Sequence, residues 1–245
     1  MQFLKIIMLV CSISWLNSLA YATTAEEWPI LSKTLTQTKQ QEMSPKQALL
    51  RLKEGNQRFL DNKSITRDYL AQAHQASYGQ FPFAVVLNCM DSRSVPELFF
   101  DQGLADLFTL RVAGNVLNDD NLGSMEFATK AMGARLIVVL SHTSCGAVAG
   151  SCSGASLGHL DDVLAKIHTV VPASMKETGL KNCEDPKLID AIAKAHALNV
   201  VKEIQEKSPI LKELIDKKQV GIVAGLHDIK TGQVYFFEEQ RSVPE

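Results

Sequence analysis

Three residues of this 245-residue chain have side chains and positions that suit a metal ion. Cys89 ends an apolar run that begins at Phe83, and His142 and Cys145 follow a second apolar run with the spacing His-x-x-Cys. That spacing lets two side chains converge where a chain turns from a strand into a helix. Two thiolates and an imidazole suit Zn²⁺, and three protein ligands leave one tetrahedral position free, as in catalytic zinc sites.

A pair of opposite charges follows the first candidate ligand. The segment Cys89-Met-Asp-Ser-Arg93 places Asp91 and Arg93 directly after the cysteine. A guanidinium is the natural bidentate partner for a carboxylate. Taken alone, the cysteine fits a buried apolar residue and the charged pair fits a surface ion pair. Their combination with His142 and Cys145 favours a reactive metal site.

The elements that must position these residues follow an alternating pattern. Five short apolar runs predict strands, and helical periodicity fills the gaps between them. This alternation predicts an α/β fold with a mostly parallel central sheet of four to five strands, flanked by helices and preceded by an N-terminal helical arm. Ligands bind beyond the carboxyl ends of such strands, where Cys89 and His142 stand. The predicted strands span 83–89, 107–112, 135–141, 220–226 and 234–237, and the predicted helices 45–59, 122–132, 157–170 and 186–207.

The N-terminus reads as an export signal. Lys5 precedes an apolar run over 6–16 that is too short to span a bilayer, and Ala20-Tyr-Ala22 suits signal peptidase. We therefore expect a signal peptide over 1–22, an arm of little intrinsic order over 23–43, a single domain over 44–245, and a periplasmic protein without a stable membrane anchor. An uncleaved anchor is the alternative.

Composition and the remaining cysteines and histidines set further expectations. The chain is 46% hydrophobic and 21% charged with a formal charge of −2, which is typical of a globular protein and gives no reason to expect nucleic acid as a partner. Cys152 and Cys183 could form a disulfide in an oxidising compartment or remain a free buried pair. No proton shuttle is assigned among His74, His159, His168, His196 and His227.

The two motifs together resemble a known family. Cys89 to Arg93, combined with His142-Thr-Ser-Cys-Gly146, resembles the paired signature of β-class carbonic anhydrases, and further similar segments lie at 44–59, 99–114, 122–128 and 208–211. The resemblance covers roughly 44–240. It implies one zinc ion per subunit, held by Cys89, His142 and Cys145, and reversible hydration of CO₂ to bicarbonate and a proton by attack of zinc-bound hydroxide.

The resemblance also implies roles for neighbouring residues. Asp91 would accept a hydrogen bond from the hydroxide and orient it, while Arg93 would hold Asp91 away from the metal. Gln80 matches a glutamine that reaches substrate across a dimer interface in plant-like members, and Phe108 a phenylalanine in the CO₂ pocket. Gln80 could equally be a loop residue and Phe108 part of the sheet core. The implied assembly is a homodimer or a tetramer.

Some positions depart from the family, and other functions stay open. Asn88 and Ser141 precede the first two ligands where relatives usually carry Gly, so their side chains should narrow access or add a hydrogen bond. Val86 replaces a tryptophan of bicarbonate-regulated members, which argues against that regulatory site. The alternatives are a cysteine hydrolase with Cys145 as nucleophile and His142 as base, a zinc-stabilised binding protein, and a relative acting on carbon disulfide or carbonyl sulfide.

Overall fold

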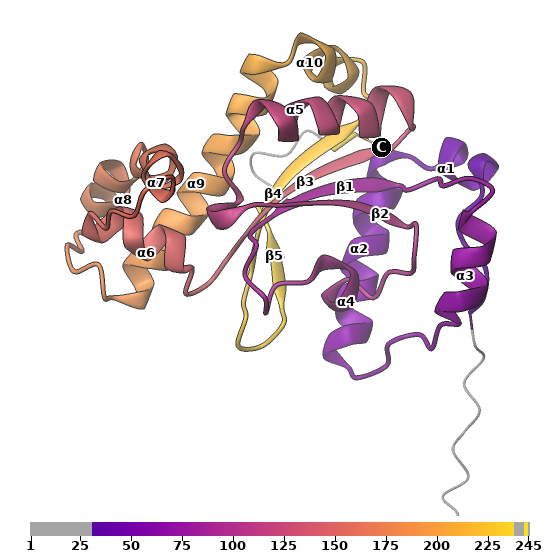
Figure 1. Ribbon diagram of the computed structural model, residues 1–245, viewed down its shortest axis with the longest axis horizontal. Helices are drawn as coiled ribbons and strands as arrows, with labels where there is room; N and C mark the ends of the chain where they lie inside the picture. The colour runs from indigo at the N-terminus through magenta and orange to yellow at the C-terminus, as the bar shows by residue number, and fades with distance from the viewer. Residues whose placement is uncertain (1–30, 238–242, 245) are drawn as a thin grey trace, which may run out of the picture.

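The computed structural model describes residues 31–237 and 243–244 (Figure 1). The predicted signal peptide and the arm as far as residue 30 lie outside the described residues. The elements, in chain order, are α1 Gln37–Glu42, α2 Pro45–Leu60, α3 Tyr69–Ala76, β1 Ala84–Asn88, α4 Pro96–Phe99, β2 Leu107–Arg111, η1 Ala113–Asn115, α5 Asp119–Glu126, η2 Phe127–Ala131, β3 Leu136–His142, α6 Gly146–Ser153, α7 Leu160–His168, α8 Val171–Thr178, α9 Pro186–Lys207, α10 Pro209–Asp216, β4 Gly221–His227 and β5 Val234–Phe236.

The strands form one sheet in the order β2-β1-β3-β4-β5. The first four are parallel to one another, and β5 runs antiparallel to β4 at the edge. The predicted α/β fold with a mostly parallel sheet flanked by helices is therefore confirmed. Each of the five predicted runs became a strand, with ends that differ by at most one residue from the prediction.

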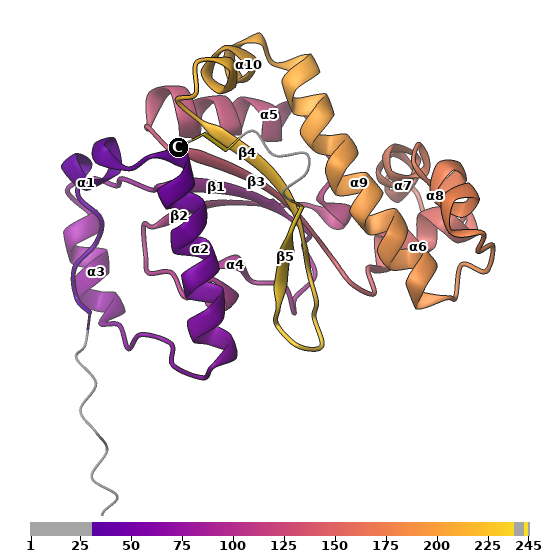
Figure 2. The same ribbon diagram turned by 180° about the vertical axis from the view of Figure 1, so that it is seen from behind.

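Helices cover both faces of the sheet, which explains why its strands are apolar at successive positions. On one face, Val85 and Leu87 of β1 belong to a core cluster shared with α5, η2, α9 and α10. On the other, Ala84 and Val86 belong to a cluster shared with α2 and α4. Figures 1 and 2 show α9 and α2 on opposite sides of the strands.

The strand order creates a switch point between β1 and β3. The chain leaves β1 toward β2 on one side and later returns to β3 on the other, so loops diverge beyond the carboxyl ends of these two neighbours. Asn88 pairs with Leu140, which places Cys89 beside the end of β3. At this end of the sheet, α6, α7 and α8 gather against the first half of α9 (Figure 2).

The N-terminal helices are fixed to the sheet by specific contacts. Residues 23–43 were expected to have little order, yet α1 forms there, and Gln40 donates from Nε2 to the carbonyl oxygens of Pro82 (2.7 Å) and Met132 (2.8 Å). Helix α2 begins after Ser44, whose side chain accepts a hydrogen bond from the backbone N–H of Gln47. Within it, a Cβ on Gly55 would overlap the backbone oxygen of Phe100, so α2 and the end of α4 are in close contact there.

Several helices differ from their predicted spans. Over 122–132 the sequence predicted one helix, but α5 ends at Glu126 and a π-helical turn follows as η2. The helix predicted over 157–170 is shorter, Leu160–His168. The helices α3, α4, α6, α8 and α10 were not predicted. Among the described residues, no helix combines the length and the apolar character that crossing a membrane requires.

Candidate metal centre

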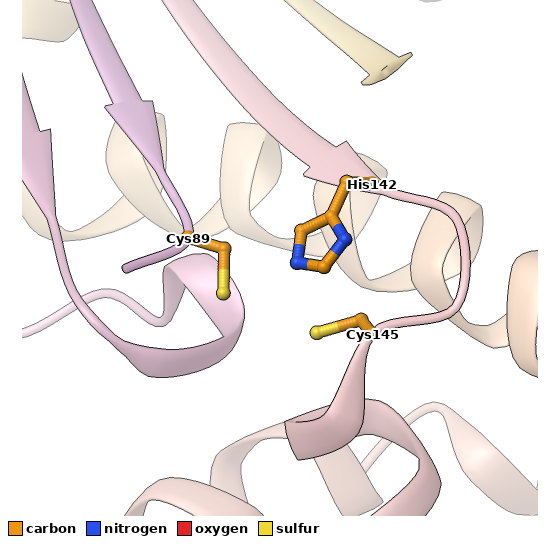
Figure 3. Close-up of side chains that lie close together, drawn as sticks. All are labelled: Cys89, His142 and Cys145. Carbon is orange, nitrogen blue, oxygen red and sulfur yellow. The ribbon is translucent and has the colours of Figure 1, made fainter. Parts of the chain in front are cut away.

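The three predicted ligands meet beyond the carboxyl ends of β1 and β3. Cys89 follows β1, His142 is the last residue of β3, and Cys145 caps the start of α6. Their candidate ligand atoms all lie within 4.8 Å of one another, and all three residues are buried. Figure 3 shows both sulfur atoms and the imidazole directed toward one shared space.

The imidazole is oriented as a metal ligand would be. His142 Nδ1 lies 2.9 Å from the carbonyl oxygen of Thr143. Because a carbonyl only accepts, Nδ1 carries the hydrogen, and Nε2 of the neutral ring presents a lone pair. Nε2 is buried without a hydrogen-bond partner in the described part of the chain. A buried nitrogen lone pair that faces two cysteine sulfur atoms fits Zn²⁺, because the ion would bind this nitrogen and both sulfur atoms.

The two sulfur atoms share a proton when no cation neutralises them. The hydrogen bond from the Cys145 thiol lowers the pKa of Cys89, and this pairing outweighs the opposing effect of burial. The same hydrogen bond, together with burial, raises the pKa of Cys145. One thiolate and one thiol thus face each other, and a divalent cation would displace the remaining proton and bind both thiolates.

Asp91 and Arg93 form a bidentate pair at the edge of the site. Arg93 donates from Nε to Asp91 Oδ1 (3.0 Å) and from Nη2 to Oδ2 (2.7 Å). The guanidinium holds the pKa of the Asp91 carboxyl well below its usual range. Asp91 Oδ2 lies 3.8 Å from His142 Nε2, and its side chain is only 16% exposed. The ionised carboxylate is therefore next to the ligands and is held there by Arg93.

Arg111 holds the backbone of the same loop, a function that the sequence analysis missed. It donates from Nη2 to the carbonyl oxygen of Asp91 (2.6 Å) and from Nε to that of Cys89 (3.2 Å). The sequence signal that could have indicated this function was the position of Arg111 at the end of β2, the strand that pairs with β1. The backbone N–H of Gly114 donates to Cys89 Sγ over 3.3 Å. The first ligand is thus fixed by two neighbouring segments.

The turn between His142 and Cys145 is held from α9 and β4. Ser144 has a positive φ of 54°, which is uncommon for a residue with a side chain. Its N–H donates to Asp190 Oδ1 (3.2 Å), and the N–H of Thr143 donates to the carbonyl oxygen of His227 (2.9 Å). Asp190 was not recognised from the sequence, because its contact is made across 46 positions.

The two polar residues before the ligands add hydrogen bonds. Asn88 donates from Nδ2 to the carbonyl oxygen of Ser94 (2.8 Å), and Ser141 donates from Oγ to Asn115 Oδ1 (3.1 Å). Both are buried, so they tie the loops of the site together. Of the two effects expected at these positions, the hydrogen bond is the one observed.

The structure does not bring the two predicted substrate residues to the ligands within one chain. Gln80 is exposed and precedes β1, whereas Cys89 follows it, so the strand separates them. Phe108 lies in the edge strand β2 opposite Val85, and its partly buried ring packs against the core cluster beneath α5. Their roles in binding substrate remain predictions.

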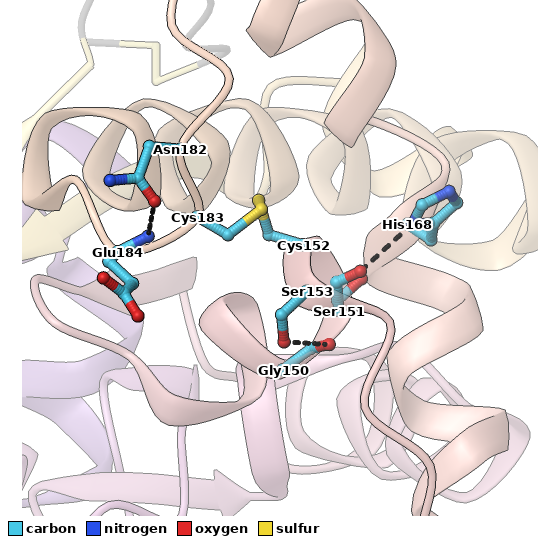
Figure 4. The surroundings of a disulfide bond; sticks show 8 residues. All are labelled: Gly150, Ser151, Cys152, Ser153, His168, Asn182, Cys183 and Glu184. Atoms are coloured by element: carbon cyan, nitrogen blue, oxygen red, sulfur yellow. Dashed lines mark hydrogen bonds between the residues drawn. A yellow bond between two sulfur atoms is a disulfide. The ribbon is translucent and has the colours of Figure 1, made fainter.

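Cys152 and Cys183 form a disulfide (Figure 4). The sequence had left this pairing open. The bond joins α6, which starts at the residue after Cys145, to the segment before α9. It therefore connects the helix that follows a metal ligand to the helix that supports the site.

A buried Cys-His-Cys centre with an ion-paired aspartate, placed at the switch point of a parallel sheet, defines a zinc enzyme of the α/β class. Comparisons give the family. The family model described as carbonic anhydrase matches residues 84–234. Carbonic anhydrase 2 of Mycobacterium tuberculosis is 32% identical over 196 residues, which cover 78% of this chain and 91% of that protein. The carbonic anhydrase of Mycolicibacterium smegmatis is 31% identical, covering 78% and 92%.

Solved structures share the fold. The β-carbonic anhydrase CcaA superposes with a TM-score of 0.64 at 23% identity, covering 78% of this chain and 95% of that chain. A tetrameric β-carbonic anhydrase from Sordaria macrospora gives 0.62 at 23% identity, covering 68% and 85%. The chain belongs to the carbonic anhydrase family and has the fold of the β-carbonic anhydrases, and its Cys-His-Cys site fits the zinc-dependent hydration of CO₂.

Proposed function

We propose that this chain converts CO₂ and water reversibly to bicarbonate and a proton, with Cys89, His142 and Cys145 holding one zinc ion per subunit. The observation that carries the proposal is the convergence of these ligand atoms within 4.8 Å beside an ionised aspartate. Zinc, when bound, would acidify a water ligand so that it attacks CO₂ near neutral pH.

Asp91 and Arg93 then have separate positioning roles. Asp91 stays ionised across the neutral range because Arg93 lowers its pKa, so it accepts a hydrogen bond and orients the attacking oxygen. Arg93 engages both carboxylate oxygens and thereby keeps Asp91 from becoming a ligand itself.

The geometry favours this proposal over a cysteine hydrolase. A nucleophilic Cys145 would need a lowered pKa, yet the Cys89 pairing and burial raise it. The hydrolase would also leave Cys89 and Asp91 without a role. Turnover assays with CO₂, carbon disulfide and carbonyl sulfide distinguish which of these substrates the protein acts on.

We further propose that the protein is exported to the bacterial periplasm and acts as a homodimer or tetramer with a plant-like substrate pocket. The Cys152–Cys183 disulfide supports an oxidising compartment. The separation of Gln80 from the ligands of its own chain supports an oligomer, because only a second copy could present Gln80 to the site.

The test combines metal analysis with a stopped-flow CO₂ hydration assay on the purified protein. We expect one zinc per chain and hydration that is lost in Cys145→Ser, while carbonyl sulfide is turned over more slowly than CO₂. A metal-free protein that hydrates CO₂ fully, or a zinc-loaded one that does not, would refute the proposal.

Export and assembly need separate measurements. N-terminal sequencing of protein taken from the periplasm should begin at Thr23, and light scattering should give at least two chains per particle. Gln80→Ala should lower kcat/KM at unchanged zinc content. A fully active monomer would contradict the role proposed for Gln80.

A further inference from the structure

Helix α9 carries a buried histidine that is not one of the three candidate metal ligands. His196 is 1% exposed, and its Nε2 lies 2.9 Å from the carbonyl oxygen of Gly114. Because the carbonyl only accepts, Nε2 carries the hydrogen and Nδ1 of the neutral ring has none. Burial lowers the pKa of His196 to about 4, so the ring stays neutral and keeps donating near neutral pH.

The residue that His196 holds is itself bonded to a ligand. Gly114 accepts from His196 at its carbonyl oxygen and donates from its N–H to Cys89 Sγ over 3.3 Å. Two hydrogen bonds therefore connect α9, through the η1 turn, to the sulfur that follows β1. His196 is 82 positions away from Gly114 in sequence.

The η1 turn needs such support because its backbone is unusual. Gly114 has φ +63° and the next residue, Asn115, has φ +44°. Two successive left-handed residues are costly, the second especially because it is not glycine. A Cβ on Gly114 would come within 2.5 Å of Ile167 Cδ1, so the turn is also closely packed. Ser141 holds the Asn115 side chain, and His196 holds the Gly114 carbonyl.

We propose that His196 is a positioning residue of the metal centre: its bond to the Gly114 carbonyl aims the Gly114 N–H at Cys89 and so moderates the charge that this thiolate donates to the metal. An N–H that donates to a ligand sulfur withdraws electron density from it, and outer partners of this kind tune the metal. Without the bond, the thiolate becomes a stronger donor and the metal a weaker Lewis acid. The inference rests on the proposed function, since it takes Cys89 to be a zinc ligand.

The test uses the full-length protein loaded with Co²⁺ or Zn²⁺. His196→Phe keeps a buried ring but removes the donor, and His196→Gln offers an amide N–H to the same carbonyl. Val200→Ala is the matched control, because Val200 is also buried in α9 but belongs to the core cluster that β1 shares with α5, η2, α9 and α10. The control should change thermal stability without changing the metal centre.

We expect His196→Phe to shift the thiolate-to-Co²⁺ charge-transfer band to longer wavelength. It should also move the pH midpoint of CO₂ hydration toward alkaline pH and lower kcat/KM at pH 7 about 10-fold. His196→Gln should restore much of each change, and Val200→Ala should leave band and midpoint unaltered. An unshifted band and midpoint in folded, metal-loaded His196→Phe would overturn the inference.

A measurement on the unmutated protein covers the case in which His196→Phe does not fold. In the ¹¹³Cd-substituted protein, the Gly114 amide proton should show a scalar coupling to ¹¹³Cd through Cys89 Sγ. If that coupling is absent, the inference fails even though the metal site stands. If the unmutated protein binds no metal or does not hydrate CO₂, the proposed function fails, and the inference with it.

Discussion

Removing the Cys152–Cys183 disulfide should destabilise the protein by an amount that follows from its position in the chain. The two cysteines are 31 positions apart. In the chain-entropy model, cross-linking a loop of this length removes about 12 cal/mol/K from the unfolded state, or about 3.7 kcal/mol at 25 °C. At about 2–4 °C per kcal/mol for a chain of this size, the melting temperature should fall by about 7–15 °C.

The assay compares thermal melts of the wild type with Cys152→Ser/Cys183→Ser, both loaded with zinc. Thiol titration of the denatured proteins confirms that the wild type holds the bond. The double variant removes the need for a thiol reductant, which would also bind zinc, and a non-chelating reductant should not lower its melting temperature further. Equal melting temperatures for the oxidised wild type and the double variant would refute the entropic reasoning.

Three further predictions concern the site and its support. Arg93→Met should lower kcat at least about 100-fold at both pH 7 and pH 9, with zinc retained, because Asp91 loses the guanidinium that holds it in place. The free energy of unfolding should change by less than about 1 kcal/mol, since the Arg93 side chain is 56% exposed. Because the pKa of Asp91 is depressed, its ion pair with Arg93 stabilises the folded state at any pH above the ordinary aspartate pKa, and this contribution is lost only as pH falls below that value. Chemical denaturation of Arg93→Met at pH 6 and at pH 8 should therefore give the same loss of unfolding free energy. Zinc rebinding to chelator-stripped protein at pH 7 should release between about one and two protons, because Cys145 must lose its proton and because, against the opposing effect of burial, the Cys89 sulfur raises the pKa of His142. Calorimetry in two buffers of different ionisation enthalpy would contradict this by showing none. Gly55→Ala should cost about 1–3 kcal/mol in urea denaturation, because its Cβ meets the Phe100 backbone, whereas Gly123→Ala, which meets nothing, should not.

The strands could be predicted because their signal is local. The parallel strands β1, β3 and β4 are covered on both faces and read as continuous apolar runs, as in the Leu-Ile-Val-Val-Leu segment of β3, whereas the parallel edge strand β2 is only half-buried. The helices were less predictable where packing rather than amphipathic periodicity decides them. Helix α6, Gly146–Ser153, is rich in Gly, Ala and Ser and carries no clear apolar stripe. The π-helical turn after Glu126 has no sequence signature at all.

Non-local pairings could not be predicted for a different reason. Whether Cys152 meets Cys183 depends on how α6 lies against the start of α9, and nothing in the spacing of the cysteines determines that distance. The same holds for the N-terminal arm, where Gln40 is ordered by carbonyl groups 42 and 92 positions away.

The metal centre combines both kinds of information. Its ligands lie in two short motifs that are legible because strand ends meet at a switch point. Their alignment, however, depends on Arg111 and Asp190, which hold the two ligand-bearing turns across 20 and 46 positions. Ligand identity is thus a property of local sequence, whereas ligand geometry is a property of the packed fold. A chain that kept both motifs but lost these supports would still have the ligands of a zinc enzyme, without the contacts that align them.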